Sequence, residues 1–320
     1  MSMTNFPGGI TSMGVPVMGG GLPATYGTVF FVNPDTGDDT NYDGKSAETP
    51  FATVAAALAA CTTNKDDVIV LSTSTAHTIS AMLDVSISRV HFVSMDFYGR
   101  LYGQRARLTM ATTTATTDLY LMKNTGTGNT FTGIKFDNAN ALTQNVAAVG
   151  EGGEYTVYRN CEFYDSTKLT SDTHAEMVLN GDSAQFFNCT FGSLATAVSG
   201  DKVRPAILLT RETITGKVAR DVYFDGCKFW KNAGGTTTAM VKGAATDVER
   251  VMEFHDCQFV ANPLGSTPAV AISTATLTAG MILLTGDTCA THCTKIATAT
   301  GIFSCLPARV ATATIGIQTT

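Results

Sequence analysis

The feature that most constrains the fold of this chain is a short pattern repeated at a nearly constant interval. Each copy has two apolar residues separated by one residue, then Asn, Asp or Gly, and then Cys-x-Phe or Ile-x-Phe. From Ile134 to Cys257, the steps between equivalent positions are 27, 28, 38 and 30 residues. A weaker sixth copy, HFVSMDFYG, has Met95 and Phe97 in these places. The five clear copies place Ile134, Cys161, Cys189, Cys227 and Cys257 at the first position, and Phe136, Phe163, Phe191, Phe229 and Phe259 two residues later.

This repeat predicts a solenoid of β-strands. Alternating apolar and polar residues are typical of short strands, and Asn, Asp and Gly tolerate the backbone of a bend between them. One repeat cannot bury an apolar face alone, whereas stacked repeats bury it continuously. We therefore predict an all-β fold, a right-handed parallel β-helix, with the Cys and Phe positions in interior rows. The residue between Cys and Phe should then face outward: Lys135, Glu162, Thr190, Lys228 and Gln258.

An antiparallel β-sandwich is the alternative fold, but it does not explain copies of one local pattern at regular spacing. The composition agrees with β structure, because Thr is abundant and charged residues make up only 15% of the chain. The net charge of -6 argues against a nucleic-acid partner. Apolar runs are too short for a membrane span, and the N-terminus MSMTNFPGGI has no secretory signal pattern. We expect a product made in a cytoplasm.

Eight cysteines invite a disulfide framework or a zinc site. Without a secretory signal, disulfides are not expected in a chain of this length. The nearest zinc candidate is Cys289-x3-Cys293, with His292 between the two cysteines. We favour buried free thiols for the repeat cysteines.

The chain divides into four predicted regions. Residues 1–27 form an extended arm, whose apolar side chains we expect to lie on a partner. Residues 28–66 form an N-terminal cap of a strand, a polar loop and a short helix, with Thr49 as N-cap and Pro50 at the first helical position. Residues 67–262 form the β-helix, and residues 263–320 form a C-terminal β region or a last irregular coil. The apolar side chains of the arm are Phe6, Ile10, Met13, Val15, Val17 and Met18.

Two segments carry a resemblance to known proteins. TVFFVNPDTGDDTNYDGKSAETPFATVAAALAAC, followed by DDVIVLS, resembles the entry segment of right-handed parallel β-helix proteins. The beginning, NFPGGITSMGVPVMGG, is similar to the N-termini of β-helix structural proteins from tailed-phage genomes. The resemblance covers about the first 140 residues and implies a virion protein, which the repeats alone do not indicate.

Few residues of the sequence match the motifs of known catalytic sites. Polygalacturonase-like Asp clusters with Gly-His-Gly and Arg-x-Lys are absent from the sequence, as is the segment typical of pectate lyases around a Trp. Paired carboxylates for glycoside hydrolysis must face each other across a groove. The candidates Asp165, Asp182, Asp225 and Glu253 read as turn or outward residues, and His255 before Asp256 reads as a structural hydrogen bond. We therefore expect no catalytic site and no cofactor.

A metal site has one weak candidate, the polar loop of the predicted cap. Its carboxylates could hold calcium, although Asx turns in a Gly-rich loop explain them as well. They are Asp35, Asp38, Asp39 and Asp43.

These observations lead to one expected function and its alternatives. We expect a non-enzymatic phage virion protein, a capsid decoration or cement protein, anchored by its arm on the major capsid protein or another virion protein. A homotrimer is expected, located in the virion, with no nucleic-acid or membrane partner. The alternative is a tail-spike or fibre protein that binds or cleaves host surface polysaccharide. A bacterial surface adhesin is a third class, disfavoured by the lack of a secretory signal.

Overall fold

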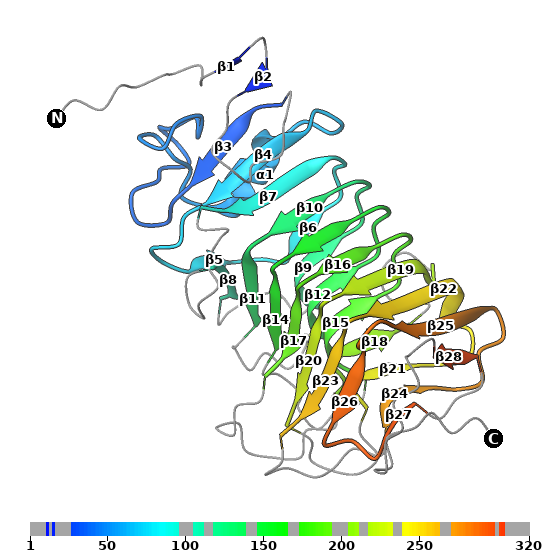
Figure 1. Ribbon diagram of the computed structural model, residues 1–320. Helices are drawn as coiled ribbons and strands as arrows, with labels where there is room; N and C mark the ends of the chain where they lie inside the picture. Colours follow the sequence, from blue (N-terminus) through cyan, green and yellow to red (C-terminus); the bar gives the residue numbers. More distant parts are fainter. Residues whose placement is uncertain are drawn as a thin grey trace.

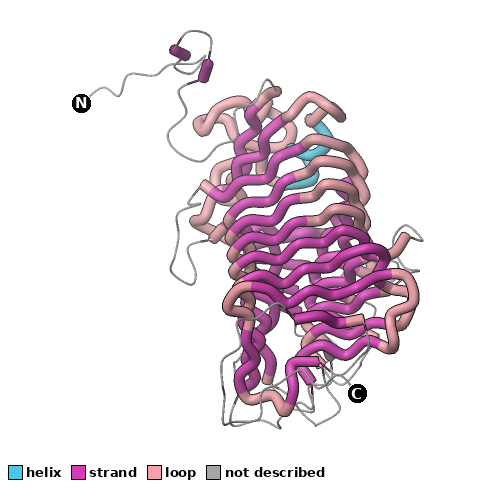
Figure 2. The backbone as a smooth tube through the Cα atoms, turned by 45° about the vertical axis from the view of Figure 1, so that its right-hand side comes forward, coloured by secondary structure: helices cyan, strands magenta, loops and turns pink. Residues whose placement is uncertain are grey.

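The protein is a parallel β-helix, as the computed structural model shows (Figure 1). Each coil contributes one strand to each of three sheets, and successive coils stack in parallel (Figure 2). The predicted all-β solenoid is therefore confirmed. The structure describes residues 11–12, 15–16, 27–95, 105–111, 118–138, 146–165, 173–193, 204–210, 217–232, 239–262, 270–297 and 301–304.

Three sheets, which we call I, II and III, run along the solenoid. Sheet I contains, in spatial order, β3 (Val29–Val32), β4 (Asp67–Leu71), β7 (Val90–Ser94), β10 (Thr130–Thr132), β13 (Val157–Arg159), β16 (Gln185–Phe187), β19 (Ala219–Asp225), β22 (Val248–His255), β25 (Gly280–Thr285) and β28 (Ile302–Ser304). Sheet II contains β5 (His77–Ile79), β8 (Ala106–Met110), β11 (Ile134–Asn138), β14 (Glu162–Asp165), β17 (Thr190–Gly192), β20 (Lys228–Lys231), β23 (Gln258–Ala261) and β26 (Cys289–Thr291). Sheet III contains β6 (Leu83–Val85), β9 (Tyr120–Asn124), β12 (Ala147–Glu151), β15 (Ala175–Leu179), β18 (Ile207–Leu209), β21 (Val241–Gly243), β24 (Val270–Thr274) and β27 (Lys295–Ala297).

The corner between sheets I and II explains the Asn, Asp or Gly before each Cys. The residue at this corner adopts a positive φ, a conformation that Asn, Asp and above all Gly reach at low cost. This one residue, with a left-handed backbone conformation, turns the chain from sheet I into sheet II. The corner residues and their φ values are Gly133 (69°), Asn160 (53°), Asn188 (52°), Gly226 (62°) and Asp256 (51°).

Two rows of stacked aromatic rings fill the interior. In sheet II, the rings of Phe136, Phe163, Phe191, Phe229 and Phe259 stack with centroids 4.7 to 5.2 Å apart. Their edges meet a second row on sheet I at 5.4 to 6.5 Å, an arrangement that aromatic quadrupoles favour. The second row contains Phe92, Phe131, Tyr158, Phe186, Phe224 and Phe254.

The repeat cysteines form a third interior row beside the corner. Cys161, Cys189, Cys227 and Cys257 are buried free thiols, and Ile134 stands in line with them. Each thiol has two main-chain carbonyls within reach of its single hydrogen; the Sγ of Cys161, for example, lies 3.4 Å from the oxygens of both Phe131 and Arg159.

The prediction of a sixth copy of the repeat is wrong. Met95 is 52% exposed, and Phe97 lies outside the described residues. In that coil, Ala106 pairs with Ile134 and Leu108 with Phe136, so these smaller residues take the interior places.

The sheets continue after residue 262 although the Cys-x-Phe pattern ends there. Strands β24 to β28 extend all three sheets. Cys289 pairs with Gln258 and Ala290 with Phe259, so Thr288 stands in line with Cys257 and Ala290 with the phenylalanines. The division of the chain into four regions stays a prediction.

The one helix within the described ranges, α1 (Val54–Ala60), lies at the N-terminal end of the solenoid (Figure 2). Its N-cap is Thr53, whose side chain accepts from the Ala56 amide, so the expectation of Thr49 was wrong. The preceding segment is extended because Phe51 forms a parallel bridge with Val32, and the Asp39 carboxylate accepts from the Thr53 amide at 3.0 Å. That α1 acts as a cap stays a prediction.

The expected arm falls mostly outside the described residues. These undescribed positions include Phe6, Ile10, Met13, Val17 and Met18. Val15 begins β2 (Val15–Pro16), which pairs antiparallel with β1 (Thr11–Ser12). Among the described residues, no helix has the length and apolar character needed to cross a membrane.

Candidate functional site

The outward face of sheet I carries a strip of aromatic and charged side chains that crosses four neighbouring strands. Alternation along each strand sends Phe186, Phe224 and Phe254 inward and their neighbours outward. The Arg159 guanidinium lies 4.4 Å from the Phe187 ring centroid, which lies 6.1 Å from that of Tyr223. The Tyr223 ring in turn lies 6.4 Å from the His255 ring, nearly parallel to it. Three strand spacings give this aromatic strip a length of about 14 Å.

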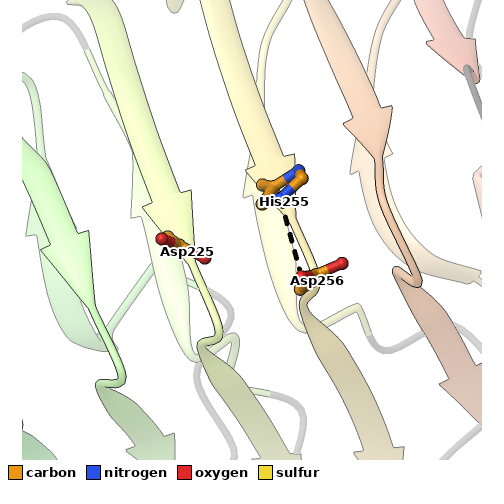
Figure 3. Close-up of side chains that lie close together, drawn as sticks. All are labelled: Asp225, His255 and Asp256. Carbon is orange, nitrogen blue, oxygen red and sulfur yellow. Dashed lines mark ion pairs between the residues drawn. The ribbon is translucent and has the colours of Figure 1, made fainter.

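A group of three titratable side chains lies at the end of the aromatic strip, at the corner between sheets I and II. Asp225 and His255 end the paired strands β19 and β22, and Asp256 is the corner residue that follows (Figure 3). One ligand-capable atom from each side chain lies within 4.8 Å of the others. Among the described residues, this is the one set of three His, Cys, Asp or Glu side chains that could hold a metal ion. We call it the acid–base group.

The tautomer of His255 follows from its hydrogen bonds. The Thr285 hydroxyl donates its single hydrogen to Glu253 Oε1 at 2.7 Å. The Thr285 oxygen therefore accepts at its other contact, the 2.9 Å bond with His255 Nδ1. Nδ1 then carries a hydrogen, which leaves Nε2 of the neutral ring as a proton acceptor, 3.5 Å from Asp256 Oδ2. A base oriented through a hydroxyl and a carboxylate is suited to proton transfer, and also to metal ligation.

Carboxylates around this site change the acidity of its tyrosine. Partial burial raises the pKa of the Tyr223 hydroxyl, and the charges of Asp225 and Glu253 raise it further. Tyr223 therefore stays protonated and can donate a hydrogen bond to a ligand.

A separate cavity of about 270 Å³ lies on the outward face of sheet II. Its charged lining comes from Arg105, which precedes β8, and from outward residues of β8, β11 and β14; residues 73–76 also line it. The charged residues are Arg105, Arg107, Lys135 and Glu162. We call it the sheet II cavity.

The weak calcium candidates are not brought together as a metal site. Asp35 accepts from the hydroxyls of Ser74 and Thr75, and these bonds lower the pKa of its carboxyl. The pKa of Asp38 is lowered by its bonds from the side chain and main chain of Asn41 and from the amide of Thr40. Asp39 and Asp43 accept main-chain hydrogen bonds from Ala52, Thr53 and Lys45. Within the described ranges, these carboxylates stabilise the loop and do not share a site.

The zinc candidate is likewise not assembled. Cys289 is exposed whereas Cys293 is buried, and burial raises the pKa of the Cys293 thiol to about 11. A zinc ligand must be a thiolate, which this environment disfavours.

A buried polar network lies where sheet III turns toward sheet I. Glu151 is fully buried and accepts from Tyr158 Oη at 2.5 Å, Gly153 N at 2.7 Å, Asn124 Nδ2 at 2.9 Å and Thr156 Oγ1 at 3.2 Å. Burial raises the pKa of Glu151 to about 7, although these hydrogen bonds act in the opposite direction. The network is enclosed, so we assign it to stability.

Comparison with known proteins identifies the fold. No protein-family model and no curated protein matches the chain. The solved structures similar to it include the pectate lyase Pel9A, with 14% identity and a TM-score of 0.55 over 81% of this chain. This chain spans 62% of the length of that pectate lyase. Others are the pectin methylesterase PemA from Erwinia chrysanthemi (12% identity, TM-score 0.48, 88% of this chain and 81% of that one) and the Dettilon tailspike protein (10%, 0.34, 87% and 68%).

The expectation that the chain is not an enzyme is corrected by these comparisons. The pectate lyase Pel9A, which shares the fold, is an enzyme named for its action on pectate. A capsid decoration role is not supported, and a phage origin is not shown. The expected virion location, capsid partner and trimer stay predictions.

Sequence reasoning named most of the site but assigned it no chemistry. The sequence predicts Asp225 and Glu253 to be turn or outward residues, and His255 before Asp256 to make a structural hydrogen bond. The structure brings these four residues to one corner with Thr285. Asp182 instead pairs with Arg220, and the side chain of Asp165 lies outside the described residues. One feature of the sequence could have indicated this site. Outward positions that are equivalent in successive repeats hold Tyr223 and Glu253, and likewise Asp225 and His255.

Proposed function

We propose that the protein is a polysaccharide-acting enzyme that binds a glycan along the aromatic strip and cleaves it at the acid–base group. The main observation behind this proposal is the position of His255, whose ring is oriented by Thr285 and Glu253 and lies next to Tyr223. The fold shared with the pectate lyase supports this class of substrate.

The roles follow from the geometry. Phe187 and Tyr223 offer ring faces against which the apolar face of a sugar can pack. His255 Nε2 takes a proton either from water, whose oxygen then bonds to the anomeric carbon, or from a sugar carbon, whose C–H electron pair then forms a C=C bond. In both cases the glycosidic C–O bond breaks, and the leaving oxygen takes up a proton from the imidazolium or from water. The nearby Asp225 and Asp256 stabilise the imidazolium. Thr285 and Glu253 hold the ring in the tautomer that this role requires.

Cleavage assays test this proposal. The full chain is incubated with pectate, pectin and purified bacterial surface polysaccharides, while reducing ends report hydrolysis and ultraviolet absorbance of unsaturated products reports elimination. The variant His255→Gln should lower kcat about a hundredfold or more. Tyr223→Ala should mainly raise KM. A chelator should leave activity unchanged, whereas loss of activity would assign the acid–base group to metal binding.

A matched control is available on the same sheet. His91, on β7, makes a similar contact, with its Nδ1 2.8 Å from Thr130 Oγ1. It is separated from β22 by β10, β13, β16 and β19. His91→Gln should therefore retain wild-type activity. The proposal fails if wild-type protein cleaves none of these glycans, or if the His91 and His255 variants behave alike.

A further inference from the structure

The sheet II cavity is lined by more positive than negative charge. Of its charged residues, Arg105, Arg107 and Lys135 are cations, and Glu162 is the single carboxylate. Among the described residues, Asp137, two positions after Lys135 on the same strand, is the other carboxylate that contacts them. Three cations thus share two carboxylates.

The ion pairs of this cluster are shared. Glu162 lies 3.1 Å from Arg105 Nη1 and 3.2 Å from Lys135 Nζ. Asp137 lies 3.6 Å from Lys135 Nζ and 4.0 Å from Arg107 Nη1. Lys135 therefore touches both carboxylates, and one positive charge has no counter-charge of its own among the described residues.

Partial burial leaves one donor atom of Arg105 without a partner. The Arg105 side chain is 19% exposed, and its buried Nε makes no hydrogen bond with any described residue. A charge that is withdrawn from water without full pairing disfavours the folded state, and a bound anion relieves this cost. Guanidinium groups also present planar donor pairs that match the oxygens of carboxylate, sulfate or phosphate.

Two hydroxyls of the other lining segment, residues 73–76, are already engaged. The hydroxyls of Ser74 and Thr75 donate to Asp35 Oδ2 at 2.7 and 2.9 Å, so their hydrogens are already engaged. The basic wall is therefore the donor-rich side. A volume of about 270 Å³ is close to the lower end of small-ligand pockets, which suits an anionic group with a single sugar ring better than a longer ligand.

We propose that the sheet II cavity binds an oxyanion, a carboxylate, sulfate or phosphate group, either free or carried by a sugar. This site is separate from the acid–base group, and its occupancy does not depend on cleavage. Lys135 and Arg107 supply the accessible charge, because their side chains are 28% and 54% exposed, and Arg105 lies deeper.

Calorimetric titration of the full chain at low salt tests the site with four probes: inorganic phosphate, inorganic sulfate, glucuronate and glucose. The oxyanions should bind saturably and glucose should not, and added salt should weaken the binding. Lys135→Met and Arg107→Gln should each lower the affinity about tenfold or more. Glucuronate binding more tightly than phosphate identifies a sugar-borne group, and the reverse order identifies a free anion.

The control is Lys228→Met, because Lys228 occupies the same outward row of sheet II, beyond Glu162 and Thr190, and is exposed. It should leave the affinity unchanged. The proposal is overturned if no oxyanion binds, if glucose binds as tightly as glucuronate, or if Lys228→Met weakens binding as much as Lys135→Met. Circular dichroism of each variant verifies that the fold is retained.

Discussion

Replacing the buried Glu151 by glutamine should remove a pH dependence from the stability of this protein. Burial raises the pKa of Glu151 from 4.5 to about 7 in the folded state, against the effect of its hydrogen bonds. Each unit of pKa difference corresponds to about 1.4 kcal/mol, so ionising this carboxyl in the folded protein costs about 3 kcal/mol.

The sign of the effect follows from which state holds the proton. Between pH 4.5 and about 7, the folded protein keeps the Glu151 proton and the unfolded chain releases it. The stabilisation is therefore complete below pH 4.5, falls as the pH rises, and is lost above about 7. Glutamine does not titrate. With its NH2 group toward Tyr158 Oη it can donate there, while its oxygen accepts from Gly153, Thr156 and Asn124 Nδ2, which lies 3.1 Å from that oxygen position.

Urea unfolding of wild type and Glu151→Gln across this pH range measures the effect. The difference in the free energy of unfolding should change by about 3 kcal/mol in favour of the variant from the acid to the alkaline end. The exposed Glu48→Gln is the control and should give a constant difference. Parallel curves for wild type and Glu151→Gln would show that Glu151 ionises normally in the folded protein, and would refute the reasoning.

Two further predictions concern the interior rows. Phe229→Ala removes a ring stacked between Phe191 and Phe259 and should lower the free energy of unfolding by about 3–5 kcal/mol. Urea denaturation measures this loss, with the exposed Tyr42→Ala as the control. A loss as small as that of the control would contradict the stacked row. Burial raises the pKa of the Cys161, Cys189 and Cys227 thiols well above its usual value. Peptide mapping after alkylation of the native protein should therefore find these thiols unmodified and the exposed Cys289 modified. Equal labelling of buried and exposed cysteines would argue against a closed core.

Local sequence was sufficient to predict the solenoid. A corner residue such as Asn160 or Gly226 is needed because the backbone there has a positive φ, and the alternation around it follows from burial on one face. Both requirements act within a few residues and recur in each coil, so they leave a repeated pattern. Where small residues fill the same places, as Ala106 and Thr288 do, the pattern fails although the coil remains.

The candidate sites, in contrast, were decided by the tertiary structure. Parallel stacking places His255 beside Asp225 of the preceding coil and Thr285 of the next one, about 30 residues away in each direction. Their partnership depends on the register between coils, and the connecting segments that set this register vary in length. Outward positions also lack the burial that constrains interior residues, so nothing local distinguishes Lys135, which lines the sheet II cavity, from Lys228, which lies in the same row outside it. The sequence therefore determined the coil, and only the stacking of coils determined which side chains share a site.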